Sequence, residues 1–211
     1  MIVLLDNQDS FVYNLVDAFS GHETVVYRNT VPAREIMALE PDLIVLSPGP
    51  GYPRDAGSMM ELIDEAQGKV PMLGICLGFQ ALIEHHGGRV APCGPVHGAS
   101  ISMRLEGPGL DSPLFAGLGP DVPVARYHSL GALDVPAGMH SLARTPTQIG
   151  EVIMAAATDD AMSIGLQFHP ESILSPAGPL ILERAVELLT TPNTTPSTTP
   201  NTAERRINDG K

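Results

Sequence analysis

The sequence predicts an α/β protein with a doubly wound, mostly parallel sheet and added antiparallel strands. Three observations support this fold class. Short apolar runs alternate with amphipathic segments through residues 2–91, which is the order of strands and helices in a doubly wound sheet. After residue 95 the chain changes to short strand-like pieces between turns rich in proline and glycine, which favour antiparallel strands. The length of 211 residues suits one domain and a tail.

Four apolar runs in the first half are the expected parallel strands. They are bounded by polar, glycine or proline residues and are apolar throughout, apart from Gly74. Strands that are buried on both faces of a parallel sheet have this pattern. The expected strands cover residues 2–5, 25–27, 43–46 and 72–75.

Amphipathic segments between these runs are the expected helices. The first carries apolar residues at helical spacing, and Asp9 or Ser10 can cap it. The fourth begins at Leu77, directly after a strand, and the glycine pair at 87–88 ends it. The expected helices cover residues 11–19, 33–39, 58–66 and 77–86.

The second half predicts further strands, some of them antiparallel, and a closing helix. The strands are expected over residues 100–105, 122–128, 152–157 and 163–168, and the helix over 180–189. Residues 190–202 then form a polar repeat with proline at every fourth position, which cannot build a core. We therefore expect one domain over residues 1–189 and a flexible tail over residues 190–211.

Composition and charge exclude several classes of protein. The chain has 24 acidic and 12 basic side chains, whereas a nucleic-acid binder needs a cationic face. No apolar run approaches the roughly 18 residues that cross a membrane, and the apolar opening is too short for a signal peptide. Two cysteines cannot make a disulfide framework. We expect a cytoplasmic protein with neither nucleic acid nor membrane as a partner.

Cys76 is a candidate nucleophile. It follows an expected strand, precedes an expected helix and has Gly74 and Gly78 two positions away on either side. A sharp strand-to-helix turn needs such small residues, because the backbone is crowded there. The helix start favours a thiolate, and the amide of Leu77 can point at a developing oxyanion. The alternative is a buried structural cysteine, and a nearby base would decide between the two.

His169 and Glu171 are the candidate base and its orienting group. In an extended segment residues two apart project to the same side, and Pro170 stiffens the turn between them. The carboxylate can hold one imidazole nitrogen while the other faces a thiol, which is the geometry of a triad. The alternative is a histidine and a glutamate in a surface loop. The distance from Cys76 to His169 distinguishes the two.

The loop at residues 47–53 is a third candidate element. Its sequence Ser-Pro-Gly-Pro-Gly-Tyr-Pro follows a buried strand and exposes backbone amides at the sheet edge where α/β proteins bind ligands. A rigid turn and a phosphate-binding loop are the alternatives, but no lysine follows as a phosphate loop requires. Oxyanion stabilisation fits this loop better than phosphate binding.

These three stretches together resemble the class I (triad) glutamine amidotransferases. The family's hallmarks are a GxCxG elbow, a proline–glycine oxyanion loop and a late HPE sequence, and the resemblance spans residues 1–189 in collinear order. It is closest to the amidotransferase components of anthranilate synthase and aminodeoxychorismate synthase. The finer matches are DNQDSFVYN at residues 6–14, PGPG at 48–51, YHSL at 127–130 and FHPESIL at 168–174.

The resemblance implies a flavodoxin-like core and a glutaminase that forms a thioester at Cys76 and releases ammonia. His169 would act as general base and then general acid, with Glu171 orienting it. The implied oxyanion and glutamine-binding residues are Gly49, Pro50, Gly51, Leu77, Gln80, Ser129 and Leu130, of which Gly49 and Leu77 offer the oxyanion amides. The reaction needs no metal or organic cofactor on this chain.

A partner carries the other half of the reaction that the resemblance implies. The substrate L-glutamine would supply ammonia to a chorismate-binding synthase subunit, component I, which holds Mg²⁺ and forms a hetero-oligomer with this chain. Anthranilate for tryptophan biosynthesis is the favoured product, with aminodeoxychorismate, or both, as the alternative. Ala99 departs from the family, which commonly has a basic residue there.

Two other functions are weighed against this one. An amidotransferase subunit for guanylate or carbamoyl phosphate synthesis is disfavoured, because those relatives lack the DNxDSF opening. A flavodoxin-like binding protein without turnover would leave Cys76 merely buried, and it predicts that electrophilic glutamine analogues do not label this cysteine.

Overall fold

The computed structural model describes residues 1–96 and 98–191. Its strands are β1 (Ile2–Asp6), β2 (Thr24–Arg28), β3 (Leu43–Leu46), β4 (Met72–Ile75), β5 (Ala91–Pro92), β6 (Ala99–Leu105), β7 (Asp121–Arg126), β8 (Leu130–Gly131), β9 (Met139–Thr147), β10 (Gly150–Thr158) and β11 (Ser163–Leu166). Its helices are α1 (Val12–Ala18), α2 (Ala33–Met37), α3 (Met59–Ala66), α4 (Leu77–His85), α5 (Gly107–Leu110) and α6 (Gly178–Thr190), with short 3-10 turns η1 (Pro53–Asp55) and η2 (Pro113–Phe115).

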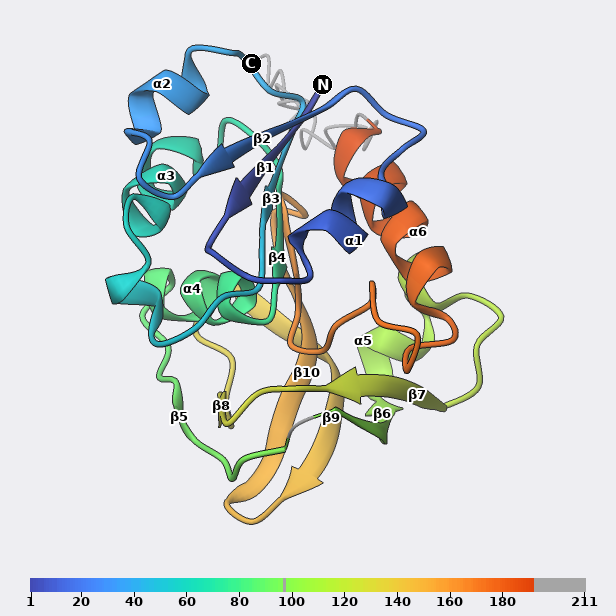
Figure 1. The fold of residues 1–211 in the computed structure, drawn as a ribbon. Helices are drawn as coiled ribbons and strands as arrows, with labels where there is room; N and C mark the ends of the chain where they lie inside the picture. Colours follow the sequence, from blue (N-terminus) through green and yellow to red (C-terminus); the bar gives the residue numbers. More distant parts are fainter. Residues whose placement is uncertain (97, 192–211) are drawn as a thin grey trace, which may run out of the picture.

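Nine strands of the described chain form one mixed sheet in the order β2-β1-β3-β4-β11-β10-β9-β6-β7. The neighbours from β2 to β11 are parallel, and those from β11 to β7 are antiparallel. Helices α2, α3 and α4 cover one face of the parallel part, and α1 and α6 cover the other (Figure 1). The doubly wound, mostly parallel sheet with antiparallel additions is therefore confirmed.

The parallel strands lie where the apolar runs predicted them, but one of them is not buried on both faces. β2 is at the edge of the sheet, and Val26 in its middle is 42% exposed. An edge strand has a neighbour on one side only, so part of its surface meets solvent. The expectation of two-sided burial was wrong for this strand.

Three further details differ from the sequence expectations. The first helix begins at Val12 without a side-chain cap, and Asp9 instead accepts a hydrogen bond from the Phe11 amide in the turn before it. The expected strands over 122–128 and 163–168 end two residues early, at Arg126 and Leu166. Strand β9 was not predicted, because its apolar residues follow neither strict alternation nor a continuous run.

The closing helix was expected over residues 180–189, and the structure has it as α6, Gly178–Thr190. Helix α6 closes the fold and ends at Thr190, one residue beyond the expected 189. The predicted tail from residue 192 onward lies outside the described residues. In the part of the chain that is described, no helix is long and apolar enough to cross a membrane.

The carboxyl ends of β4 and β11 lie side by side at the centre of the sheet. Gly165 pairs with Gly74, and Leu166 pairs with Ile75, in parallel register. Both strands are fully buried. Residues that directly follow β4 and β11 must therefore meet at one edge of the sheet, which is where ligands bind in open α/β sheets.

Gly165 permits the close packing of α4 on this pair of strands. A Cβ atom there would lie 1.9 Å from Cδ2 of Phe79, whose ring is completely buried. The ring has no room to move away, because protein cores are close-packed.

We expect Gly165→Ala to lower the free energy of unfolding by about 2–3 kcal/mol, since the added methyl group overpacks the core. Urea unfolding followed by circular dichroism measures the change. Gly119→Ala is the matched control, because nothing lies within 4 Å of its Cβ position and the residue is exposed. Equal stability of the two variants would contradict this packing.

Candidate active site

Cys76 occupies a strained turn between β4 and α4. Its backbone has φ 50° and ψ −100°, a left-handed conformation that a residue with a Cβ rarely adopts. Its amide donates to the Leu166 carbonyl at 2.8 Å, and its carbonyl accepts from the Gln80 amide at 3.0 Å. The turn thereby presents the thiol at the start of α4, as the nucleophile elbow pattern predicts.

Glycines on both sides of Cys76 are required by the crowding of this turn. A Cβ atom at Gly74 would lie 2.7 Å from the Gly78 carbonyl oxygen, and one at Gly78 would lie 2.3 Å from the Leu46 carbonyl oxygen. Real Cβ contacts with backbone are essentially never so short. The GxCxG spacing therefore has the steric cause that the sequence suggested.

His169, three residues beyond the end of β11, forms a buried pair with Glu171. Nδ1 of His169 lies 2.7 Å from Oε1 of Glu171, and the two side chains are 3% and 0% exposed. The carboxylate holds Nδ1, so the other imidazole nitrogen is available to the thiol. The Cys76 side chain is near enough to this imidazole to contribute to the raised pKa of His169. The structure thus brings the three predicted catalytic side chains together and rejects the surface-loop alternative for the pair.

The pKa of His169 is strongly perturbed. Burial lowers it, but hydrogen bonds and charge interactions with Cys76 and Glu171 outweigh burial and raise the pKa to about 10. A histidine whose pKa is raised in this way can hold a proton between the sulfur and the carboxylate. This arrangement can activate a sulfur nucleophile and later protonate a leaving group.

Two aromatic rings pack against His169. The ring centroids of Phe11 and Tyr127 lie 5.3 and 5.0 Å from that of the imidazole, both edge-on, and 5.2 Å from each other. The backbone of His169 is also fixed, because its amide donates to the Ala125 carbonyl at 3.1 Å. These contacts hold the imidazole in one orientation, since edge-on aromatic packing is geometrically specific.

Buried polar side chains form hydrogen bonds at the start of the proline–glycine loop. The Asn7 amide donates to Oγ of Ser47 at 2.9 Å, Nδ2 of Asn7 donates to the Ser47 carbonyl at 3.0 Å, and Nδ2 of Asn29 donates to Oδ1 of Asn7 at 3.3 Å. A Cβ atom at Gly49 would lie within 2.8 Å of Asn7 and Leu77 atoms. Gly49 therefore lies directly beside the first residue of α4, so two predicted oxyanion residues are neighbours.

A cavity of about 190 Å³ gathers most of the predicted binding residues. It is lined by Gly49, Pro50, Gly51, Cys76, Gln80, Tyr127, His128, Ser129 and Leu130. Leu77 is outside this lining set but contacts Gly49, and His169 and Glu171 are not among the lining residues. Segments that are far apart in the sequence therefore form one site, with the thiol on its wall.

Sequence reasoning gave no role to two residues that the structure places in the site. Gln167 is completely buried, and its Nε2 lies 3.8 Å from Sγ of Cys76. Nδ1 of His128 lies 2.7 Å from the Leu130 carbonyl oxygen, while burial and the Arg126 charge lower the pKa of His128 to about 3. A polar residue inside an otherwise apolar expected strand was the signal available for Gln167.

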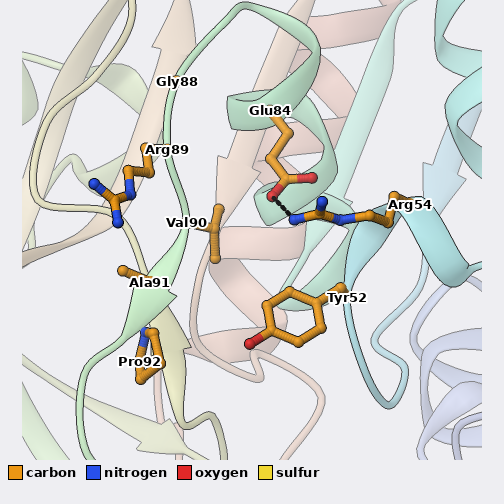
Figure 2. A pocket seen from close by; sticks show the side chains of 8 residues that line it. All are labelled: Tyr52, Arg54, Glu84, Gly88, Arg89, Val90, Ala91 and Pro92. Atoms are coloured by element: carbon orange, nitrogen blue, oxygen red, sulfur yellow. Dashed lines mark ion pairs between the residues drawn. The ribbon is translucent and has the colours of Figure 1, made fainter.

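A larger cavity of about 640 Å³ lies beside the proline–glycine loop. Figure 2 shows Tyr52 and Arg54 on one wall, Glu84 of α4 pairing with Arg54, and the segment from Gly88 to Pro92 opposite. Tyr52 directly follows Gly51, so the two cavities adjoin. This second cavity contains neither a cysteine nor a histidine. In the described parts of the chain, no group of three or more histidine, cysteine or acidic side chains could hold a metal ion.

Comparison with known proteins agrees with this geometry. The sequence model of the family "Glutamine amidotransferase class-I" matches residues 3–188. The chain is 58% identical over 202 residues to anthranilate synthase component 2 of Corynebacterium glutamicum, covering 89% of this chain and 97% of the relative. It is 47% identical to the pyocyanine-specific anthranilate synthase component 2 of Pseudomonas aeruginosa, covering 88% and 92%.

Solved structures show the same fold at lower sequence identity. A Thermoplasma acidophilum protein assigned to a GMP synthase has a TM-score of 0.75 at 22% identity, covering 89% of this chain and 92% of that one. A glutamine amidotransferase from Thermotoga maritima has a TM-score of 0.68 at 16% identity, covering 90% and 97%. At these identities the likeness concerns the fold.

We expect Glu171→Gln to lower the free energy of unfolding most at pH values below 6.5 and least near pH 10. The folded pKa of His169 is raised above 6.5, so its stabilisation is complete below 6.5 and is lost as the pH rises through about 10. The substitution removes one of the interactions that raise this pKa. Urea unfolding of both proteins between about pH 6 and pH 10 measures the difference. A difference that does not change with pH would contradict the assignment.

Proposed function

The chain belongs to the class I glutamine amidotransferase family, and from that membership we propose that Cys76, His169 and Glu171 are its catalytic residues. It is the glutamine amidotransferase subunit of an anthranilate synthase, as its identity to component 2 relatives over nearly their whole length indicates. The observation that carries the catalytic proposal is the buried histidine–glutamate pair, whose histidine pKa is raised by a cysteine in a strained elbow and by the glutamate. The aminodeoxychorismate alternative is not favoured.

The first half of the reaction forms a thioester. His169 holds the proton that the Cys76 thiol has lost, and the sulfur attacks the side-chain carbonyl carbon of glutamine. The resulting oxyanion accepts hydrogen bonds from the backbone amides of Gly49 and Leu77, two residues that approach each other through the Leu77 side chain. His169 then protonates the leaving nitrogen, the carbon–nitrogen bond breaks, and ammonia departs.

The second half regenerates the enzyme. Water attacks the thioester, and His169 accepts one of its protons and returns it to the sulfur, so glutamate and the free thiol result. Glu171 keeps the imidazole in one tautomer through both steps, because its carboxylate accepts a hydrogen bond from the Nδ1–H group. The sum is glutamine plus water giving glutamate plus ammonia, with no metal or organic cofactor on this chain.

Glutamine binds in the cavity beside the thiol. The Leu130 carbonyl accepts from Nε2 of Gln80 at 3.1 Å and faces Nδ1 of His128, and the Ser129 carbonyl accepts from the Cys93 amide at 2.8 Å. These bonds fix the segment of Ser129 and Leu130, whose backbone binds the amino-acid end of the substrate. Pro50 and Gly51 close the opposite side of the cavity.

The partner is a chorismate-binding component I, to which this chain delivers ammonia within a hetero-oligomer. The name component 2 of the relatives supports such a partner. Mg²⁺ belongs to the partner subunit in this proposal. The formal charge of −12 supports the absence of a nucleic-acid partner, and we place the protein in the cytoplasm with no membrane partner.

We expect a mixture of this chain with an anthranilate synthase large subunit from the same source to make anthranilate from chorismate and glutamine. Cys76→Ser should abolish the glutamine-dependent reaction, because an alcohol is a far poorer nucleophile here than a thiolate. The same variant should leave the reaction with ammonium salts intact. Anthranilate fluorescence follows both reactions. If glutamine is hydrolysed but no anthranilate forms, the assignment of the catalytic residues stands and the assignment of the partner subunit is wrong.

The surface around the catalytic residues offers apolar contacts to the partner. Ile173, two residues after Glu171, is 94% exposed, and Tyr13 of α1 is 81% exposed. Phe11, which packs on His169, lies two residues before Tyr13, so both exposed side chains are close in sequence to residues of the site. A synthase that closes over the site would bury them.

We expect Ile173→Asp to weaken binding of the synthase subunit by at least about tenfold, because a charge replaces an apolar contact. Glutamine hydrolysis by the free chain should stay at the wild-type level. Ile149→Asp is the matched control, since Ile149 is also exposed but lies in the turn that joins the antiparallel strands β9 and β10. Isothermal titration calorimetry measures the affinity, and equal effects of both variants would contradict this docking face.

A further inference from the structure

Gln167 is a buried amide beside the nucleophile, and the reaction described above gives it no task. Its side chain is 0% exposed, and its Nε2 lies 3.8 Å from Sγ of Cys76, a hydrogen-bonding distance for sulfur. The residue directly follows β11, and its backbone amide donates to the Met154 carbonyl at 2.9 Å. A fully buried amide at this distance can donate a hydrogen bond to the sulfur.

The hydrogen bonds determine which end of this amide faces the sulfur. The Leu130 carbonyl can only accept, so the Gln80 group that contacts it at 3.1 Å must be the NH₂ group. The same NH₂ group lies 3.2 Å from the side-chain amide of Gln167, which must therefore present its oxygen there. The NH₂ group of Gln167 is left to face Cys76.

We propose that Gln167 is a positioning residue for Cys76, at the end of a directed hydrogen-bond chain that runs from the Leu130 carbonyl through Gln80 to the sulfur. The proposal rests on the proposed glutaminase function for its purpose, but its geometry concerns the thiol alone. An N–H donor stabilises the thiolate more than the thiol, because charge-assisted hydrogen bonds are the stronger ones. It also holds the sulfur in one rotamer next to the cavity.

The chain of hydrogen bonds links substrate binding to the nucleophile. Gln80 lines the cavity, and both of its donor contacts are already made within the protein, so its Oε1 is the atom that glutamine can use. A substrate N–H donor bound to this oxygen polarises the amide of Gln80, and successive hydrogen bonds in a buried chain strengthen one another. Gln80 thus contacts the substrate. Gln167 then passes the orientation of the Gln80 amide on to the Cys76 sulfur.

The test is the pH dependence of alkylation of Cys76 by iodoacetamide in the full-length chain. Peptide mass spectrometry separates Cys76 from Cys93, the other cysteine. Gln167→Met keeps the length of the side chain but removes the donor, and we expect the inflection of the alkylation rate to rise by about one pH unit. Gln167→Glu places a carboxylate beside the sulfur and should raise the inflection further.

Kinetics in the reconstituted complex give a second readout. We expect kcat for glutamine hydrolysis to fall about tenfold in Gln167→Met while KM changes by less than about threefold, because Gln167 does not line the cavity. Gln148→Met is the matched control, as Gln148 is exposed at the β9–β10 turn, and it should retain the wild-type profile.

Two outcomes would overturn the proposal. One is an alkylation profile in folded Gln167→Met and Gln167→Glu that superimposes on that of the wild type. The other is an inflection that falls in Gln167→Glu. If Gln167→Met does not fold, Gln167→Glu alone decides, since it has nearly the same shape and remains polar. Failure of the proposed function is a separate result, because it would be seen as absent glutamine hydrolysis by the wild type, whereas alkylation needs no glutamine.

Discussion

The backbone turn at Cys76 is the constraint on which the rest of the site depends. A left-handed φ of 50° at a residue with a side chain is strained, and such strain persists only where the surroundings over-determine it. Here β4 ends and α4 begins without a loop, and the packing of Gly78 on β3 and of Gly165 under Phe79 leaves the helix one position. The thiol is therefore presented at the carboxyl edge of the sheet by closely packed backbone.

The polar groups around this turn are held by one another. Glu171 orients His169, Asn7 supports the loop that contains Gly49, and Gln80 orients Gln167. In a buried environment such interactions are stronger than in water, and the raised pKa of His169 is one result. The site is thus prepared before glutamine arrives, which lowers the cost of reorganisation during the reaction.

Local pattern was sufficient for most of the elements and for the candidate catalytic residues. Runs of four residues, apolar apart from Gly74, identified β1, β3 and β4, and the glycine spacing around Cys76 identified the elbow, because both patterns express a local steric requirement. Strand β9 escaped prediction because its place in the sheet comes from pairing with β10 and β6 rather than from its own pattern. Edge exposure of β2 and the missing helix cap at Phe11 likewise depend on neighbours.

The sequence by itself determined the fold class, the order of the first strands and helices, the elbow, and the residue types of a thiol, an imidazole and a carboxylate. Only the tertiary structure decided that these side chains meet, because the pairing of β4 with β11 joins segments about ninety residues apart. It also decided that Gln167 faces the sulfur. The direction of a buried amide is set by partners that are distant in the chain, and no local spacing encodes that direction.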